Sequence, residues 1–235
     1  AALVPVIAYQ MIEGVHLIPD VCVGARERVR SVCLVTKGED LSDVRSVSLD
    51  VSSKTSVALT KIIFREFLGF EPKWKDAEPD LNKMLADSDC ALLIGDPALG
   101  LSPESGVQSP KSPTANGGLR IANHQLPTTN YRKFDLLELW RKYTGFGFVF
   151  AMWMTHDKNC GIDFAAARDE GLGHLEEIAA NYKDEISLSG DDFKTYLTEN
   201  ISFSIDDSMR HGLELYFKLA SSHDLIPKLK PLSFA

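Results

Sequence analysis

The sequence predicts an α/β protein with parallel sheets, folded as two lobes around a cleft. Short β-branched runs alternate with helical patterns as far as residue 155, and helical patterns dominate the rest of the chain. Two apolar runs, 30–35 and 146–155, bracket the middle of the chain. If the chain crosses from one lobe to the other on these runs, they form a two-strand hinge. Lobe I then comprises 1–35 and 153–235, and lobe II comprises 36–152.

The first half of the chain is expected to supply most of the strands. These are a strand over 3–9 that runs into a short helix, an apolar run over 15–23 that ends near a turn at Gly24, and β-branched strands at 30–35 and 44–49. Between 55 and 68, apolar residues recur at helical spacing. A short helix over 79–85 and a core strand over 90–94 complete this half.

The second half begins with a segment of different composition. Residues 102–133 are rich in Ser, Pro, Gly, Asn and Thr and lack apolar periodicity, which predicts a long surface insertion. A helix over 134–143 and a buried strand over 146–155 come next. The remaining elements are helices at 164–182, 190–197 and 206–221, the last capped by Asp206 and Asp207.

Charge and composition narrow the classes of partner. The formal net charge of −8 argues against nucleic acid, because phosphate binding needs a basic face. No apolar run reaches the roughly 18 residues that suggest a membrane span. The four cysteines lack C-x-x-C spacing and indicate reduced core residues of a cytoplasmic protein. The six histidines lack metal-binding spacing, so no structural metal is expected.

Two strand-to-turn junctions carry the strongest indication of function. The strand that ends at Leu49 leads into 52–56, where hydroxyl residues stand at the start of a helix, and the strand over 90–94 stops at Gly95. Ligands of α/β sheets bind at the carboxyl ends of strands, and a helix N-terminus favours an anion. We therefore expect a small anionic ligand. Simple helix capping and an ordinary turn are the alternative interpretations.

Several runs of residues go beyond these generic patterns. In chain order they are 3–9, 19–24, 29–32, 52–57 (SSKTSV), 78–81, 91–99 (ALLIGDPAL), 135–140, 144–145, 148–151 and 196–203. Together they closely resemble the chorismate dehydratase family, whose reaction opens the futalosine route to menaquinone. The resemblance covers nearly the whole chain apart from 102–133.

The resemblance implies a fold and a reaction. The fold is the two-lobed, type II fold of periplasmic binding proteins, used here by a cytoplasmic enzyme. The reaction is loss of water from chorismate, giving 3-[(1-carboxyvinyl)oxy]benzoate, with no cofactor and no metal. Matched motif by motif, Ser31 falls at the family's cleft-facing functional serine. The positions that fall on the substrate-binding walls are Leu3, Val4, Pro5, Ser53, Thr55, Ser56, Gly95 and Asp96.

The matched positions suggest how the reaction proceeds. They offer hydroxyls, amides and one carboxylate, and no histidine or glutamate base. Our hypothesis is that the substrate's own enolpyruvyl carboxylate takes the proton from C3 while the C4 hydroxyl leaves. Ser31 hydrogen-bonds the leaving hydroxyl or holds the carboxylate, and the protein supplies orientation.

Two other functions stay open at this point. The dihydroxynaphthoate synthase family shares the fold but has a catalytic histidine followed by glutamate where this chain has Gly95 and Asp96, which favours the dehydratase. A non-catalytic solute-binding protein needs export, and no signal peptide is visible. The chain opens inside an apolar run without the family's asparagine-containing N-terminal motif, so we expect further residues before Ala1.

Overall fold

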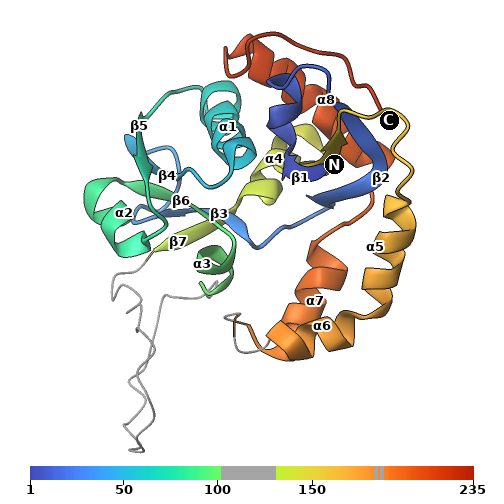
Figure 1. The fold of residues 1–235 in the computed structure, drawn as a ribbon. Helices are drawn as coiled ribbons and strands as arrows, with labels where there is room; N and C mark the ends of the chain where they lie inside the picture. The colour runs from blue at the N-terminus through green and yellow to red at the C-terminus, as the bar shows by residue number, and fades with distance from the viewer. Residues whose placement is uncertain (102–130, 183–184, 186–187) are drawn as a thin grey trace, which may run out of the picture.

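The computed structural model describes residues 1–101, 131–182, 185 and 188–235, and in this part of the chain the strands form two sheets (Figure 1). The predicted insertion at 102–133 therefore lies mostly outside the described residues. Two hydrophobic cores are present in the described chain, and the larger includes residues of both sheets.

The smaller sheet joins two strands from the start of the chain to one distant strand. Its order is β1 (Ala2–Pro5), β8 (Phe148–Thr155) and β2 (His16–Ala25), and both pairings are antiparallel. Strand β8 is apolar and is the central strand of this sheet, where a neighbouring strand on each side shields it from water. The C-terminal residues extend the edge beside β2, where the Leu17 amide donates to the Ser233 carbonyl at 2.9 Å.

The larger sheet comes from one continuous region of the chain. Its order is β5 (Lys73–Ala77), β4 (Ser46–Asp50), β6 (Cys90–Ile94), β3 (Val32–Thr36) and β7 (Arg132–Asp135). Strand β4 is parallel to both β5 and β6, whereas β3 is antiparallel to both β6 and β7. This mixed sheet places the carboxyl ends of β4 and β6 beside the start of β3.

Helices cover and connect the sheets. They are η1 (Val6–Gln10), α1 (Lys54–Ile62) with its π-helical extension η2 (Ile63–Phe67), α2 (Leu81–Asp87), α3 (Asp96–Leu99), α4 (Leu136–Thr144), α5 (Phe164–Gly173), α6 (Leu175–Tyr182), α7 (Gly190–Thr195) with its π-helical extension η3 (Tyr196–Asn200), and α8 (Asp207–Ser222). Figure 1 shows α1 between the two sheets, and α5, α6 and α7 together in an arm beside the smaller sheet. Asp206 caps α8 as predicted, accepting from the Met209 amide at 2.8 Å, whereas Asp207 is the first residue of the helix.

Several expected elements differ in the structure. The turn at Gly24 is wrong, because β2 continues to Ala25. The expected strand at 30–35 begins only at Val32, so Ser31 precedes the strand. The end of the predicted insertion is also wrong, since Arg132 and Lys133 belong to β7.

The arrangement of the sheets also differs from the expected one. The smaller sheet is wholly antiparallel, contrary to the prediction of parallel sheets. Strand β3 lies entirely in the larger sheet and β8 entirely in the smaller, so neither forms a strand of the expected hinge. The chain passes between the sheets in the connections 26–31 and 145–147 instead. The expected lobe boundaries, between 35 and 36 and between 152 and 153, fall inside β3 and β8. They would therefore assign part of each strand to the lobe that does not contain its sheet.

Within the described residues, no helix is both long and apolar enough to cross a lipid bilayer.

Candidate functional site

Ser31 lies in the connection that carries the chain from the smaller sheet to the larger. It is 7% exposed. Its hydroxyl accepts a hydrogen bond from the Tyr196 phenol at 2.9 Å and donates a long one to the Val29 carbonyl at 3.4 Å. Its carbonyl accepts from the Gly95 amide at 2.7 Å. The structure thus brings Ser31 next to Gly95, as expected, and adds Tyr196.

The register of the larger sheet brings the predicted residues near β3, β4 and β6 to one edge. Val32 pairs with Ile94 in the antiparallel β3–β6 ladder, and Leu49 pairs with Leu92 in the parallel β4–β6 ladder. The residues before β3, after β6 and after β4 therefore emerge together. Ligands of α/β folds bind at such an edge, outside the carboxyl ends of parallel strands. This edge is our candidate site.

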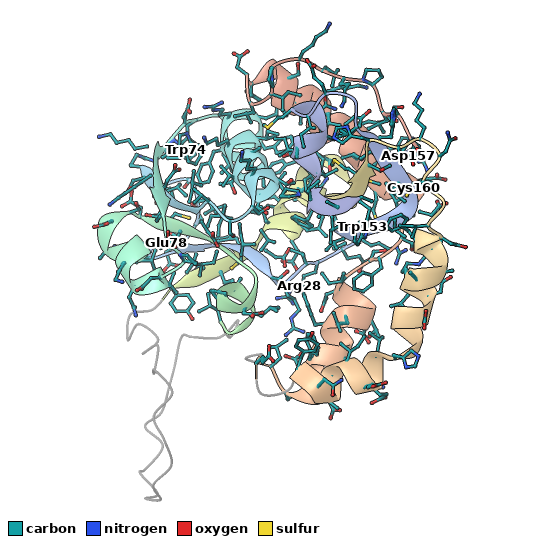
Figure 2. All side chains as sticks on the ribbon, viewed as in Figure 1. Arg28, Trp74, Glu78, Trp153, Asp157 and Cys160 are labelled. Carbon is teal, nitrogen blue, oxygen red and sulfur yellow. The ribbon has the colours of Figure 1, made fainter. Side chains whose placement is uncertain are left out.

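The connection at 28–31 is held rigidly by Asp135. This buried carboxylate caps α4 by accepting from the amides of Leu137 at 3.0 Å and Glu138 at 3.2 Å. It also accepts from the Arg30 amide at 2.6 Å and from the Val29 amide at 3.2 Å. One side chain therefore fixes both a helix start and the backbone that leads into Ser31. Arg28, on the same connection, is labelled near the centre of Figure 2.

Arg30 links the same connection to the helical arm. Its guanidinium donates to both carboxylate oxygens of Asp192 at 2.8 Å each, which is a bidentate pair. This hydrogen bonding lowers the pKa of Asp192, and the same contact raises the pKa of Arg30. The backbone of Arg30 has a positive φ of 62°, which is uncommon outside glycine. Such a conformation is found where surrounding contacts enforce it, as the contacts of Asp135 and Asp192 do here.

Gly95 and Asp96 form the turn after β6. Gly95 has φ of 74° and ψ of −143°, a backbone conformation that favours glycine. Asp96 is exposed at the first position of the short helix α3. Its negative charge acts on the Tyr196 phenol, whose pKa is raised mainly by burial and further by Asp96. Asp96, Tyr196 and Ser31 therefore share one neighbourhood.

The hydroxyls at the start of α1 are engaged within the protein. Ser53 caps the helix and accepts from the Ser56 amide at 3.3 Å, and the Ser56 hydroxyl donates to Ser53 Oγ at 3.2 Å. The fully buried Thr55 hydroxyl accepts from the Ile7 amide at 3.2 Å. Capping thus accounts for Ser53 and Ser56, and a tertiary contact with η1 accounts for Thr55. The first-turn amides at Lys54 and Thr55 are the groups that a helix leaves without intrahelical acceptors.

The strand end at Leu3, Val4 and Pro5 leads into η1, whose Ile7 contacts Thr55. Leu3 itself is exposed and faces a different space. It lines an apolar cavity of about 560 Å³ between the smaller sheet and the arm, together with Trp153 and Phe164. Trp153 is labelled in Figure 2. Ser31 is not among the residues that line this cavity. Leu3 thus lines a cavity to which Ser31 does not contribute, whereas Val4 and Pro5 are half-buried on the way to η1.

Three residues that belong to the Ser31 connection or contact it were not predicted as site residues from the sequence. They are Tyr196, Arg30 and Asp135, each of which lies within a run that carried the family resemblance or next to it. Tyr196 lies 165 positions from Ser31, so no local pattern connects the two. The signal for Asp135 was present, because an aspartate before an apolar helical run is a typical cap. In the described residues no cluster of acidic, histidine or cysteine side chains suits a metal ion.

Comparisons with known proteins agree with one another. A sequence model of the family described as menaquinone biosynthesis matches residues 1–222. A chorismate dehydratase from Thermus thermophilus is 32% identical over 213 residues, which cover 87% of this chain and 73% of that protein. Among solved structures, protein AF1704 from Archaeoglobus fulgidus superposes with a TM-score of 0.57 at 13% identity, covering 95% of this chain and 79% of that one. The last match concerns the fold alone.

Proposed function

Because the chain belongs to the menaquinone biosynthesis family and is 32% identical to a chorismate dehydratase, we propose that it is a lyase that removes water from chorismate. The product is 3-[(1-carboxyvinyl)oxy]benzoate, and the reaction belongs to the futalosine route to menaquinone. The single structural observation that supports this reading most is the meeting of Ser31, Gly95 and the start of α1 at one sheet edge.

The proposed step is an elimination. The C3–H bond breaks, its electron pair forms the new ring double bond, and the C4–O bond breaks to release hydroxide. The substrate's enolpyruvyl carboxylate takes the C3 proton and returns it to the departing oxygen, so that water leaves. The ring becomes aromatic, which supplies the driving force. No external oxidant or reductant is needed.

The protein's part in this step is orientation and hydrogen bonding. The Ser31 hydroxyl is proposed to donate to the departing C4 oxygen, where negative charge develops. Its only protein acceptor in the described residues is the Val29 carbonyl, 3.4 Å away, so a substrate oxygen at normal distance would be a better acceptor. The start of α1 is proposed to hold a substrate carboxylate through the first-turn amides at Lys54 and Thr55, beside Ser53 and Ser56.

Two broader assignments accompany this function. The two sheets are proposed to mark the two lobes of a periplasmic-binding-protein-like fold, with the chain crossing at 26–31 and 145–147. A reducing, cytoplasmic location is also proposed. It is supported by Cys22, Cys33 and Cys90, which are buried free thiols in a chain without C-x-x-C spacing.

The test is direct. The natural protein, with any residues that precede Ala1, is incubated with chorismate, and the mixture is separated by chromatography. We expect conversion to the enolpyruvyl benzoate, and we expect the Ser31→Ala variant to convert it at least tenfold more slowly. Unchanged chorismate would overturn the assignment as an enzyme. Tight binding of chorismate without turnover, measured by calorimetry, would favour the solute-binding alternative.

A further inference from the structure

We infer that Tyr196 is a positioning residue for Ser31, orienting and polarising its hydroxyl for the proposed elimination. This inference deepens the proposed function and rests on it. The phenol of Tyr196 donates to Ser31 Oγ at 2.9 Å, which is a normal hydrogen-bond length. The Ser31 hydroxyl in turn donates over 3.4 Å to the Val29 carbonyl. The three groups form a chain that points from the arm into the connection.

The order of donation in this chain determines what it can do. A hydroxyl that accepts a hydrogen bond becomes a better donor, because successive bonds polarise one another. Ser31 accepts a good bond from Tyr196 and makes only a long one as donor. The Ser31 hydroxyl can therefore redirect its hydrogen bond from the Val29 carbonyl to a substrate oxygen at little cost. The hydrogen bond from Tyr196 keeps the Ser31 oxygen in place. Tyr196 performs this role without touching the substrate.

Tyr196 is itself held in the protonated, donating state and in one place. Burial raises the pKa of Tyr196, and the neighbouring Asp96 raises it further, so the phenol keeps its proton at neutral pH. Its ring stacks on Phe193 with centroids 6.5 Å apart. The turn that carries both rings is tied to the residue before Ser31 by the bidentate pair between Arg30 and Asp192.

Two contacts between the arm and the connection, Asp192 with Arg30 and Tyr196 with Ser31, fall on adjacent residues of the connection. The arm contacts the connection at Arg30 through an ion pair and at Ser31 through a hydroxyl, one residue apart. We propose that the second contact, at the Ser31 hydroxyl, serves to orient that hydroxyl rather than to attach the arm.

The test uses Tyr196→Phe, which removes one oxygen atom and keeps the stacked ring. We expect kcat for chorismate to fall about tenfold to a hundredfold, since each factor of ten corresponds to about 1.4 kcal/mol of barrier. We expect KM to change less than threefold and the melting temperature to stay within about 2 °C. Tyr143→Phe, at an exposed ring stacked on Phe67, is the matched control and keeps wild-type kcat.

A double variant and a spectroscopic measurement complete the design. In a Ser31→Ala background, Tyr196→Phe should cause no further loss, because Tyr196 acts only through Ser31. In protein labelled with ¹³C-tyrosine, Ser31→Ala should shift the Cζ resonance of Tyr196, whether or not the protein turns over chorismate. Wild-type kcat in Tyr196→Phe, additive losses in the double variant or an unmoved resonance would each overturn the inference alone. No turnover by the wild-type protein would overturn the proposed function, and the positioning role with it.

Discussion

Thr55 shows how one residue can satisfy a family motif and still have a structural task. Its side chain is fully buried and accepts from the Ile7 amide, which ties η1 to the start of α1. Its carbonyl accepts from the Tyr216 phenol at 3.1 Å, which ties α8 to the same point. Three segments from distant parts of the chain therefore meet at this residue. The sequence motif indicated a ligand, and the structure gives the hydroxyl a protein partner.

Thr55→Val is expected to destabilise the protein. The substitution keeps the shape but leaves the buried Ile7 amide without an acceptor, which costs about 1–3 kcal/mol. Urea denaturation followed by circular dichroism measures this loss. Thr60→Val is the control on the same helix. The Thr60 hydroxyl only donates to the Ser56 carbonyl. Its removal leaves no buried donor without an acceptor, so the loss of stability should be smaller than for Thr55→Val.

The opposite result would also be informative. If Thr55→Val unfolds at the wild-type urea concentration while its affinity for chorismate falls tenfold, the hydroxyl serves the ligand and not the fold. That outcome would contradict the structural role of Thr55.

At the scale of elements, the sequence predicted the central strands of the larger sheet better than its two edge strands. Strand β6 was predicted with its observed bounds, 90–94, because an unbroken apolar run marks a strand covered on both faces. Strands β5 and β7 were missed. Their sequences, KWKDA and RKFD, are rich in charge because both lie at the edges of the sheet, where side chains reach water. These two edge strands lack the apolar pattern on which such predictions depend.

The candidate site shows the same division. The family resemblance is confirmed by the family match and by the 32% identical relative. It identified Ser31 and Gly95, and the structure places them in contact. The partner hydroxyl of Tyr196 could not be predicted, because it reaches Ser31 only through the packing of the arm. Local patterns reveal residues with strong local roles, and tertiary packing decides which of them meet.

Where α8 packs beside the start of β8, its backbone closely approaches that of Gly147, the residue before β8. A Cβ placed on Gly212 would lie 2.1 Å from the Gly147 carbonyl oxygen. We expect Gly212→Ala to destabilise the protein by about 1–3 kcal/mol, because a backbone neighbour cannot move aside as a side chain can. Gly171→Ala in α5 is the matched control. No atom lies within 4 Å of its added methyl, so it should be neutral or stabilise by up to about 1 kcal/mol.

Differential scanning calorimetry of the two variants separates these effects. Equal melting temperatures for Gly212→Ala and the wild type would show that α8 can shift away from β8 without loss. The packing of these two elements would then be looser than the backbone contact indicates.

At the scale of the whole molecule, the reactivity of the cysteines measures how often the two hydrophobic cores open to solvent. Burial raises the pKa of Cys22 and of Cys33 to about 12, and raises that of Cys90 as well. Because thiol reagents attack the thiolate, the Cys22 and Cys33 thiols are expected to react slowly at pH 8. Cys160 is only half-buried, on the connection between β8 and α5.

We expect one thiol of the native protein to react rapidly with dithionitrobenzoate at pH 8, and four to react in guanidinium chloride. The fast thiol should be absent from Cys160→Ser. Rapid reaction of a second thiol in that variant would mean that a core strand opens on the timescale of the assay. Raising the pH should accelerate the slow thiols, since a raised pKa means that the protonated form is lost only in strong alkali.

The division of the strands between the two sheets sets an order of events during synthesis. Strands β3, β4, β5 and β6 lie between Val32 and Ile94, so most of the larger sheet can pair while the ribosome is still at work. The smaller sheet cannot, because Ala2 pairs with Met154 and β8 is its central strand. Until Thr155 leaves the ribosome, β1 and β2 have no strand between them. For most of translation, the apolar residues of β1 and β2 therefore lack their native partner strand. During that time they must avoid non-native contacts and aggregation.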